Sequence, residues 1–84
     1  MKTYVVSKRF YQDFCSRFGQ VGEVLSSNTS SFKVNLTSEQ YNDLIEDARF
    51  YADTKYVMQM MGSAYLGLSR SALSTVKSLE KVGA

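Results

Sequence analysis

The chain has 84 residues, enough for one small domain but too few for an enzyme with a separate cofactor module. Histidine is absent and Cys15 is the only cysteine, which excludes imidazole catalysis, histidine-bearing zinc sites, CxxC motifs and intramolecular disulfides. Ten basic and eight acidic residues give a net charge of +2, which is too small to indicate an affinity for nucleic acid or anionic membranes.

The first predicted elements are a short strand and a helix with an aromatic face. Residues 3–6 are β-branched or aromatic, which favours a strand. Ser7 is a candidate N-cap for a helix over residues 8–18, and Gly19 is typical of the position that follows a helix. Aromatic residues spaced four apart predict the buried face of this helix: Phe10, Phe14 and Phe18. Charged residues with the same spacing predict ion pairs on its solvated side: Arg9, Asp13 and Arg17.

Two further strands are predicted over residues 21–26 and 31–36. The second alternates apolar with polar side chains, as a strand with one buried face does. The loop between them consists of small polar residues and is long for a hairpin, so we expect its tip to be mobile. The position of the first strand stays open, since the chain permits a right-handed parallel crossover or a return to the edge beside the third strand.

Residues 37–40 (TSEQ) form a capping box, in which the first and last side chains bond each other's backbone N–H groups. This motif predicts a helix over residues 38–52, and Gly62 marks a break before a last helix over residues 63–82. The order β-α-β-β-α-α predicts a single α+β domain over residues 1–84, with helices packed on one face of a small three-stranded sheet.

The charges are sorted along the chain. Residues 1–37 carry five basic and two acidic side chains (+3), residues 38–56 two basic and five acidic (−3), and residues 57–84 three basic and one acidic (+2). On the middle helix an arc of about 80° holds what we call the acidic stripe: Glu39, Asp43, Glu46, Phe50 and Asp53. Such a stripe is common on a solvated helix, but an aromatic flanked by carboxylates also suits a basic, apolar partner surface. Its carboxylates do not converge, so we predict no metal site.

The last predicted helix has a complementary surface, which we call the basic face: Arg70, Ser74, Lys77, Ser78 and Lys81. Three smaller residues fall on the same side: Ser63, Gly67 and Ser71. Cations among small hydroxyl residues are what a phosphate-contacting helix offers, because small side chains permit close approach. Two other interpretations stay open, a solvated face and docking on an acidic surface such as the middle helix of a second copy.

Catalysis and cofactor binding have little support in the sequence. Cys15 lies near the predicted apolar face, where burial keeps a thiol protonated and inert, and no glycine-rich phosphate loop occurs. Residues 56–61 hold three of the four methionines, which predicts core packing more than a binding surface. The six tyrosines could stack on bases, but their helical spacing favours core positions. We therefore predict neither an enzyme nor a cofactor.

In its size, its motif-free α+β build, its segregated surface charge and its lack of catalytic residues, the chain resembles the short accessory proteins encoded by bacteriophages. That group includes inhibitors of bacterial defence systems, so the resemblance implies an interaction protein, although it assigns a role to no residue. We expect a regulator or inhibitor that binds and occludes a macromolecular partner through charged helix faces. The expected partner is a protein. One alternative is a nucleic-acid-binding protein that uses the basic face, assisted by Lys8 and Arg9. Another is an oligomeric binder of a nucleotide-like anion.

Location and assembly are predicted from the same composition. A lone cysteine, no secretion signal and no apolar run of about 18 residues predict a cytoplasmic protein without a membrane segment. A chain this short has a small core, and a second subunit would add buried area, so we expect a homodimer or larger oligomer.

Overall fold

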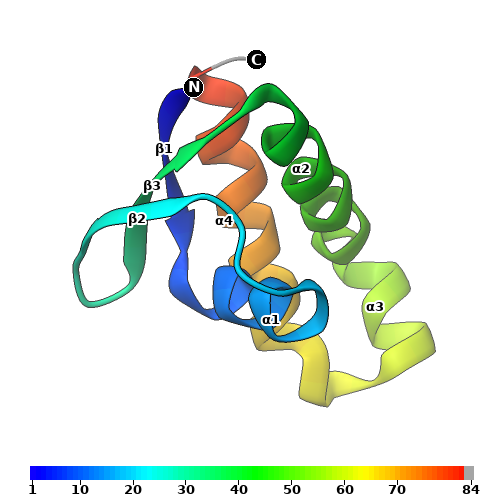
Figure 1. Ribbon diagram of the computed structural model, residues 1–84. Coiled ribbons are helices and arrows are strands. Elements are labelled where there is room, and N and C mark those ends of the chain that lie inside the picture. The colour runs from blue at the N-terminus through cyan, green and yellow to red at the C-terminus, as the bar shows by residue number, and fades with distance from the viewer. Residues whose placement is uncertain (83–84) are drawn as a thin grey trace.

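Three strands and four α-helices build an α+β fold, here described over residues 1–82 of a computed structural model (Figure 1). The elements follow the chain as β1 (Lys2–Ser7), α1 (Lys8–Phe18), β2 (Glu23–Ser27), β3 (Ser31–Leu36), α2 (Ser38–Ala52), α3 (Thr54–Met61), the 3-10 turn η1 (Ser63–Tyr65) and α4 (Leu66–Val82). None of these helices is long and apolar enough to cross a membrane. The predicted α+β class and order of elements are confirmed, and α3 is an addition to them.

The sheet is antiparallel throughout, with the strand order β1-β3-β2. The chain therefore returns after α1 to place β3 beside β1, which is the second of the two arrangements that the sequence left open. Tyr4 pairs with Val34 and Val6 with Phe32, so the apolar side chains of both strands lie on one face. β2 begins two residues later than predicted and runs to Ser27, which leaves a hairpin loop of only residues 28–30.

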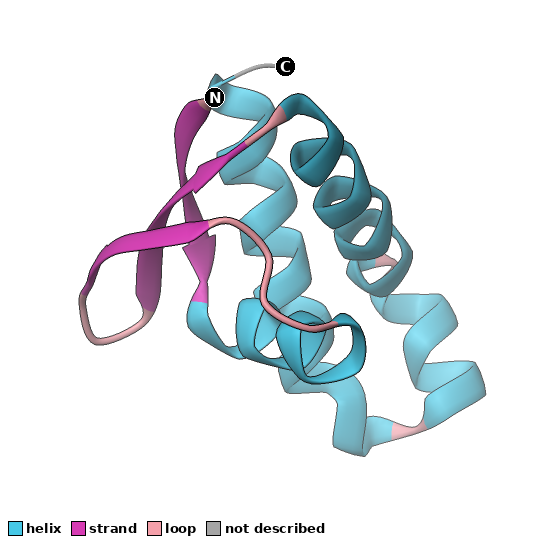
Figure 2. Cartoon of the chain, in the orientation of Figure 1, coloured by secondary structure: helices cyan, strands magenta, loops and turns pink. Residues whose placement is uncertain are grey.

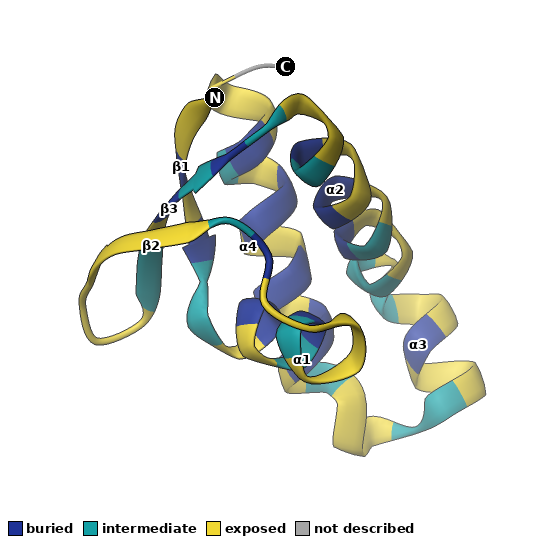
Figure 3. Cartoon of the chain, in the orientation of Figure 1, coloured by how far each residue is buried: buried dark blue, intermediate teal, exposed yellow. Residues whose placement is uncertain are grey.

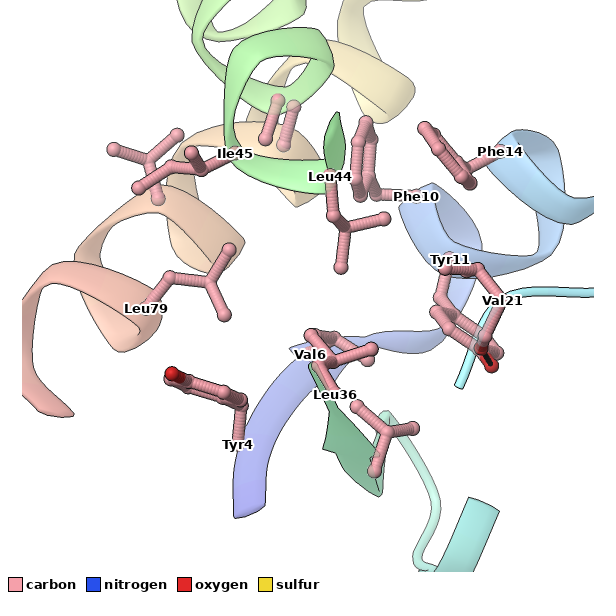
Figure 4. Close-up of a cluster of buried hydrophobic side chains, with 14 of the residues drawn as sticks. Tyr4, Val6, Phe10, Tyr11, Phe14, Val21, Leu36, Leu44, Ile45 and Leu79 are labelled. Carbon is pink, nitrogen blue, oxygen red and sulfur yellow. Dashed lines mark hydrogen bonds between the residues drawn. The ribbon is translucent and has the colours of Figure 1, made fainter. Parts of the chain in front are cut away.

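Helices cover one face of this sheet, and α4 lies between β1 and α2 (Figures 1 and 2). The side chains of Val6, Phe10, Leu44 and Leu79 are fully buried and converge from β1, α1, α2 and α4 (Figure 4). The other face of the sheet is uncovered, and β2 is exposed along its whole length (Figure 3). The predicted packing of helices on one face is confirmed.

The start of α1 is capped by another helix. Ser7 occupies the N-cap position but makes no capping hydrogen bond with its side chain, contrary to the prediction. Instead the Phe10 N–H donates to the Ser71 hydroxyl of α4 over 2.9 Å, and the Ser7 N–H donates to the Thr75 hydroxyl over 3.0 Å. Ser71 is therefore buried against α1, and its predicted position on the outer face was wrong.

The capping box at the start of α2 is confirmed. The Thr37 hydroxyl accepts from the Gln40 N–H over 3.1 Å, and the Gln40 side chain accepts from the Thr37 N–H over 2.9 Å. α3 is a short separate helix with one buried side chain, Val57. Met58 and Met60 are exposed on it, so the prediction that the methionine cluster packs in the core was wrong for these residues.

Candidate functional site

A groove of about 620 Å³ opens between the C-terminal end of α1 and the outer side of α2. Three phenylalanines and three carboxylates contribute to its lining: Phe14, Phe18, Phe50, Asp43, Glu46 and Asp47. The loop of residues 19–21 and Gln40 complete it. Because rings and carboxylates share one concave surface, we call it the acidic–aromatic groove.

The acidic stripe divides between this groove and the surface around it. Asp43, Glu46 and Phe50 line the groove, whereas Glu39 is exposed outside it. Asp53 has a structural role, because its carboxylate accepts a hydrogen bond from the Tyr56 N–H over 3.1 Å and so caps α3. The structure thus brings three of the five predicted residues together and separates the other two from them.

Arg17 joins the two helices that form the groove. Its guanidinium donates to both oxygens of Asp47, over 3.1 and 2.6 Å, and its Nε donates to Asp13 over 2.8 Å. The hydrogen bonds to Asp47, followed by those to Asp13, raise the pKa of Arg17 above its ordinary value, so its charge is permanent. The predicted ion pair between Asp13 and Arg17 is present, whereas the one expected between Arg9 and Asp13 is not formed within residues 1–82. The bridge to Asp47 of α2 was not predicted.

The loop after α1 forms one wall of the groove and is held from beneath by Tyr11. The Tyr11 hydroxyl donates to the carbonyl of Val21 (Figure 4) and accepts from the Gln20 side chain over 3.0 Å. Burial, with a smaller contribution from Cys15, raises the pKa of Tyr11 to about 12. Gly22 follows at φ +69°, and a side chain there would also collide with the carbonyl oxygen of Asn35. The wall therefore has a fixed backbone course.

Two aromatic rings of the groove are open to solvent. Phe18 is 65% exposed, so the prediction that it is buried with Phe10 and Phe14 was wrong. It is the last residue of α1, and its ring is covered only in part, by Phe14 at 4.9 Å between ring centroids and by the guanidinium of Arg17. Phe50 is 46% exposed and meets Tyr56 edge to face at 5.6 Å. Large apolar side chains on both sides of a groove are available for contact.

The groove also contains carboxylates that the chain leaves without a cation. Asp43 and Glu46 form no ion pair within residues 1–82, unlike Asp47, which Arg17 occupies. No group of three or more cysteine and carboxylate side chains in the described part of the chain is arranged to hold a metal ion. The two free carboxylates therefore give the groove a negative charge that a cationic side chain could neutralise.

The basic face lies on α4, away from the groove. Arg70, Ser74, Lys77 and Lys81 are exposed as predicted, and Ser78 is half-buried. None of these residues lines the groove. Arg9 of α1, one of the two cations expected to assist this face, extends it. Its guanidinium lies against Gly67, where a Cβ atom would come within 3.0 Å of it.

Sequence reasoning found Asp43, Glu46 and Phe50 from helical periodicity, but it missed Asp47, Phe18 and the loop of residues 19–21. The only sequence signal for this loop was the pair of glycines at its two ends, Gly19 and Gly22. Comparison with known proteins found no matching family model, no matching curated protein and no matching solved structure.

Proposed function

We propose that the chain is a small non-catalytic interaction protein that binds a basic, apolar surface of a protein partner in the acidic–aromatic groove. By occupying that surface it would act as a regulator or inhibitor of the partner in the cytoplasm. The observation that carries the proposal is the combination of exposed Phe18 and Phe50 with the unpaired carboxylates of Asp43 and Glu46 in one groove.

Each part of the groove has a distinct effect on binding. Aromatic side chains are frequent energetic anchors of protein interfaces, because burying them removes a large apolar area from water. Carboxylates beside them attract a cationic partner, speed association and disfavour acidic competitors. The Arg17–Asp47 bridge and the Tyr11 anchor hold the walls before any partner arrives, which reduces the entropy lost on binding.

Affinity capture with matched variants tests this proposal. The bait is the wild-type chain, the double variant Asp43→Lys/Glu46→Lys, the variant Phe50→Ala, or the control Glu39→Lys, which changes a charge on the same helix outside the groove. We expect a protein that is retained by the wild type and by Glu39→Lys but lost with the other two variants. Circular dichroism verifies that each bait is folded. Equal recovery of partners by all four baits would contradict the groove as the binding site.

A second candidate function is favoured by the extension of the basic face. Arg9 continues the row of Arg70, Lys77 and Lys81, and none of the four forms an ion pair within residues 1–82. Such a row is suited to contact with phosphates of a nucleic acid. Binding to a labelled duplex is then expected to weaken steeply with salt, and each cation removed should reduce the slope of log K against log salt by about 1. Duplex binding that does not depend on salt would contradict this candidate. So would a salt slope that is unchanged in the variant Lys77→Gln.

A further inference from the structure

One arginine of the chain, Arg17, lies beside the groove and contacts two of its lining residues, Phe18 and Asp47. The groups around Arg17 show how this part of the molecule holds a guanidinium. The guanidinium carbon of Arg17 lies 4.9 Å from the ring centroid of Phe18 and 5.0 Å from that of Tyr51. At the same time its nitrogens donate to both oxygens of Asp47 and to one of Asp13. A flat guanidinium can stack on an aromatic ring with its face and, at the same time, donate hydrogen bonds to carboxylates in its own plane.

Exposed rings and free carboxylates also lie together next to Arg17, where no cation of the chain binds them. Phe18 remains 65% exposed although Arg17 lies against its ring, and Phe50 is 46% exposed. Asp43 and Glu46 line this part of the groove and form no ion pair within the described residues. They are three positions apart on α2, which separates their Cβ atoms by about 5–6 Å, and the fork of a guanidinium can reach both.

We propose that the occupant of the groove is a short segment of a partner protein that presents arginine, and that the groove prefers arginine to lysine. This inference rests on the proposed function and specifies the chemistry of the partner. Lysine carries the same charge, but its ammonium is compact and strongly hydrated and cannot stack on a ring while it forms a bidentate pair. The groove volume of about 620 Å³ is in the range of ligand-sized sites, so it accepts a few side chains and not a whole folded surface.

Two peptides that differ only in the cation test the preference. The first is the acetylated pentapeptide amide Gly-Arg-Leu-Arg-Gly, and the second has lysine at both arginine positions. Each is titrated into the full, isotope-labelled chain at low salt, and the backbone amide signals of residues 19–21 and 43–47 are followed by NMR. We expect the arginine peptide to bind about tenfold more tightly than the lysine peptide, with the shifts concentrated at these residues.

Variants separate the two kinds of contact. Phe18→Leu and Phe50→Leu keep an exposed apolar side chain, and we expect them to bring the two peptide affinities close together. Asp43→Asn with Glu46→Gln should weaken both peptides, whereas the control Glu39→Gln should weaken neither beyond the small effect of a lost surface charge. Loss of the arginine preference in the phenylalanine variants alone would assign it to ring stacking.

Three results would overturn the inference. Equal affinity of the two peptides would reject arginine selectivity while leaving an acidic binding groove in place. Shifts confined to other elements, or no binding of either peptide, would reject the groove as an arginine site, and the capture experiment decides independently whether it binds a protein. Shifts of the groove amides on dilution without peptide would show that a second copy of the chain fills it.

Discussion

At the scale of single residues, a buried hydroxyl of the last helix, α4, caps the start of the first helix, α1. The Ser71 hydroxyl accepts from the Phe10 N–H and donates to the Ser7 hydroxyl, so two polar groups at the start of α1 depend on one side chain of α4. A backbone N–H buried without an acceptor is destabilising, because the water that it loses is not replaced. Ser71 therefore contributes to stability as a cap supplied from another element.

Replacing Ser71 by alanine should destabilise the fold. The change leaves the Phe10 N–H without its acceptor, and we expect a loss of about 1–3 kcal/mol in the free energy of unfolding. Urea denaturation measures this loss directly. Ser74→Ala on the exposed side of α4 is the control and should stay within about 0.5 kcal/mol of the wild type. Equal effects of the two substitutions would show that the cross-helix cap is unimportant.

The Tyr11 hydroxyl makes the fold sensitive to alkaline pH. Its pKa is raised from 10.0 to about 12, chiefly by burial, so the fold favours the neutral phenol. The corresponding stability is fully present below pH 10 and is lost as the pH rises toward 12. We expect the urea midpoint to fall over this interval and to fall less in Tyr11→Phe, which has no ionisable phenol. Some decline should remain, because burial and Tyr41 also raise the pKa of Tyr4.

A control substitution separates this effect from general alkaline denaturation. Tyr65→Phe removes a phenol whose ring is exposed on η1, and its alkaline decline should match that of the wild type. If Tyr11→Phe declined as steeply as Tyr65→Phe, ionisation of Tyr11 would not be the cause.

At the scale of elements, α3 depends more on its cap than the other helices do. It has eight residues and one buried side chain, Val57, and Asp53 provides the acceptor for the Tyr56 N–H. Isolated helices of this length are unstable in water. The cap, the packing of Val57 and the hydrogen bond from the Ser69 hydroxyl to the Thr54 hydroxyl stabilise it. Local opening of α3 is therefore expected to need less free energy than unfolding of the whole chain.

Substitutions of Asp53 distinguish a cap from a binding residue. Asp53→Asn keeps the side-chain oxygen, and we expect normal amide protection in α3 by hydrogen exchange. Asp53→Ala removes the acceptor and should lower the free energy of opening α3 by about 1 kcal/mol. Neither change should affect binding in the groove, because Asp53 does not line it. Impaired binding by Asp53→Asn would show that Asp53 contacts the partner as well as capping α3.

Local signals in the sequence predicted where helices and strands lie better than they predicted which neighbours cover them. The capping box fixes the start of α2, because its two hydrogen bonds involve residues three apart. The spacing of Phe10, Phe14 and Phe18 correctly shows that they lie along one side of α1, but it carries no information on how far the neighbouring elements extend. Phe18, at the end of the helix, is left exposed.

The candidate site could be predicted only in part for the same reason. Periodicity placed Asp43, Glu46 and Phe50 on one side of a helix, since that depends on α2 alone. The opposite wall depends on how α1 packs against α2, and the bridge that fixes it joins Arg17 to Asp47, 30 residues apart. In the sequence both residues are indistinguishable from ordinary surface charges.

At the scale of the whole molecule, charge and exposed apolar surface are distributed unevenly. The carboxylates of the groove lie on α2 and the cations of the basic face on α4, so the small net charge of +2 does not describe either surface. The end formed by α3, η1 and the first half of α4 exposes five large apolar side chains: Tyr56, Met58, Met60, Tyr65 and Leu73. Apolar side chains gathered at one end favour contact with another chain.

We expect the chain to form a homodimer or larger oligomer through this end. Light scattering after size-exclusion chromatography, over a range of concentrations, measures the mass of the particle. The double variant Met60→Ser/Tyr65→Ser changes exposed side chains only, so it should stay folded and have the mass of one chain. A wild type with the mass of a single chain at every concentration would contradict this prediction.

The contact between β1 and α4 has a consequence for the synthesis of the protein. Ser7 bonds hydroxyls that follow it by 64 and 68 residues, and contacts so distant in the chain form only after a long loop has closed. On the ribosome, β1 and α1 emerge long before the helix that caps and covers them. These two elements therefore stay open to chaperones and proteases until α4 has emerged, and the fold cannot be completed before then.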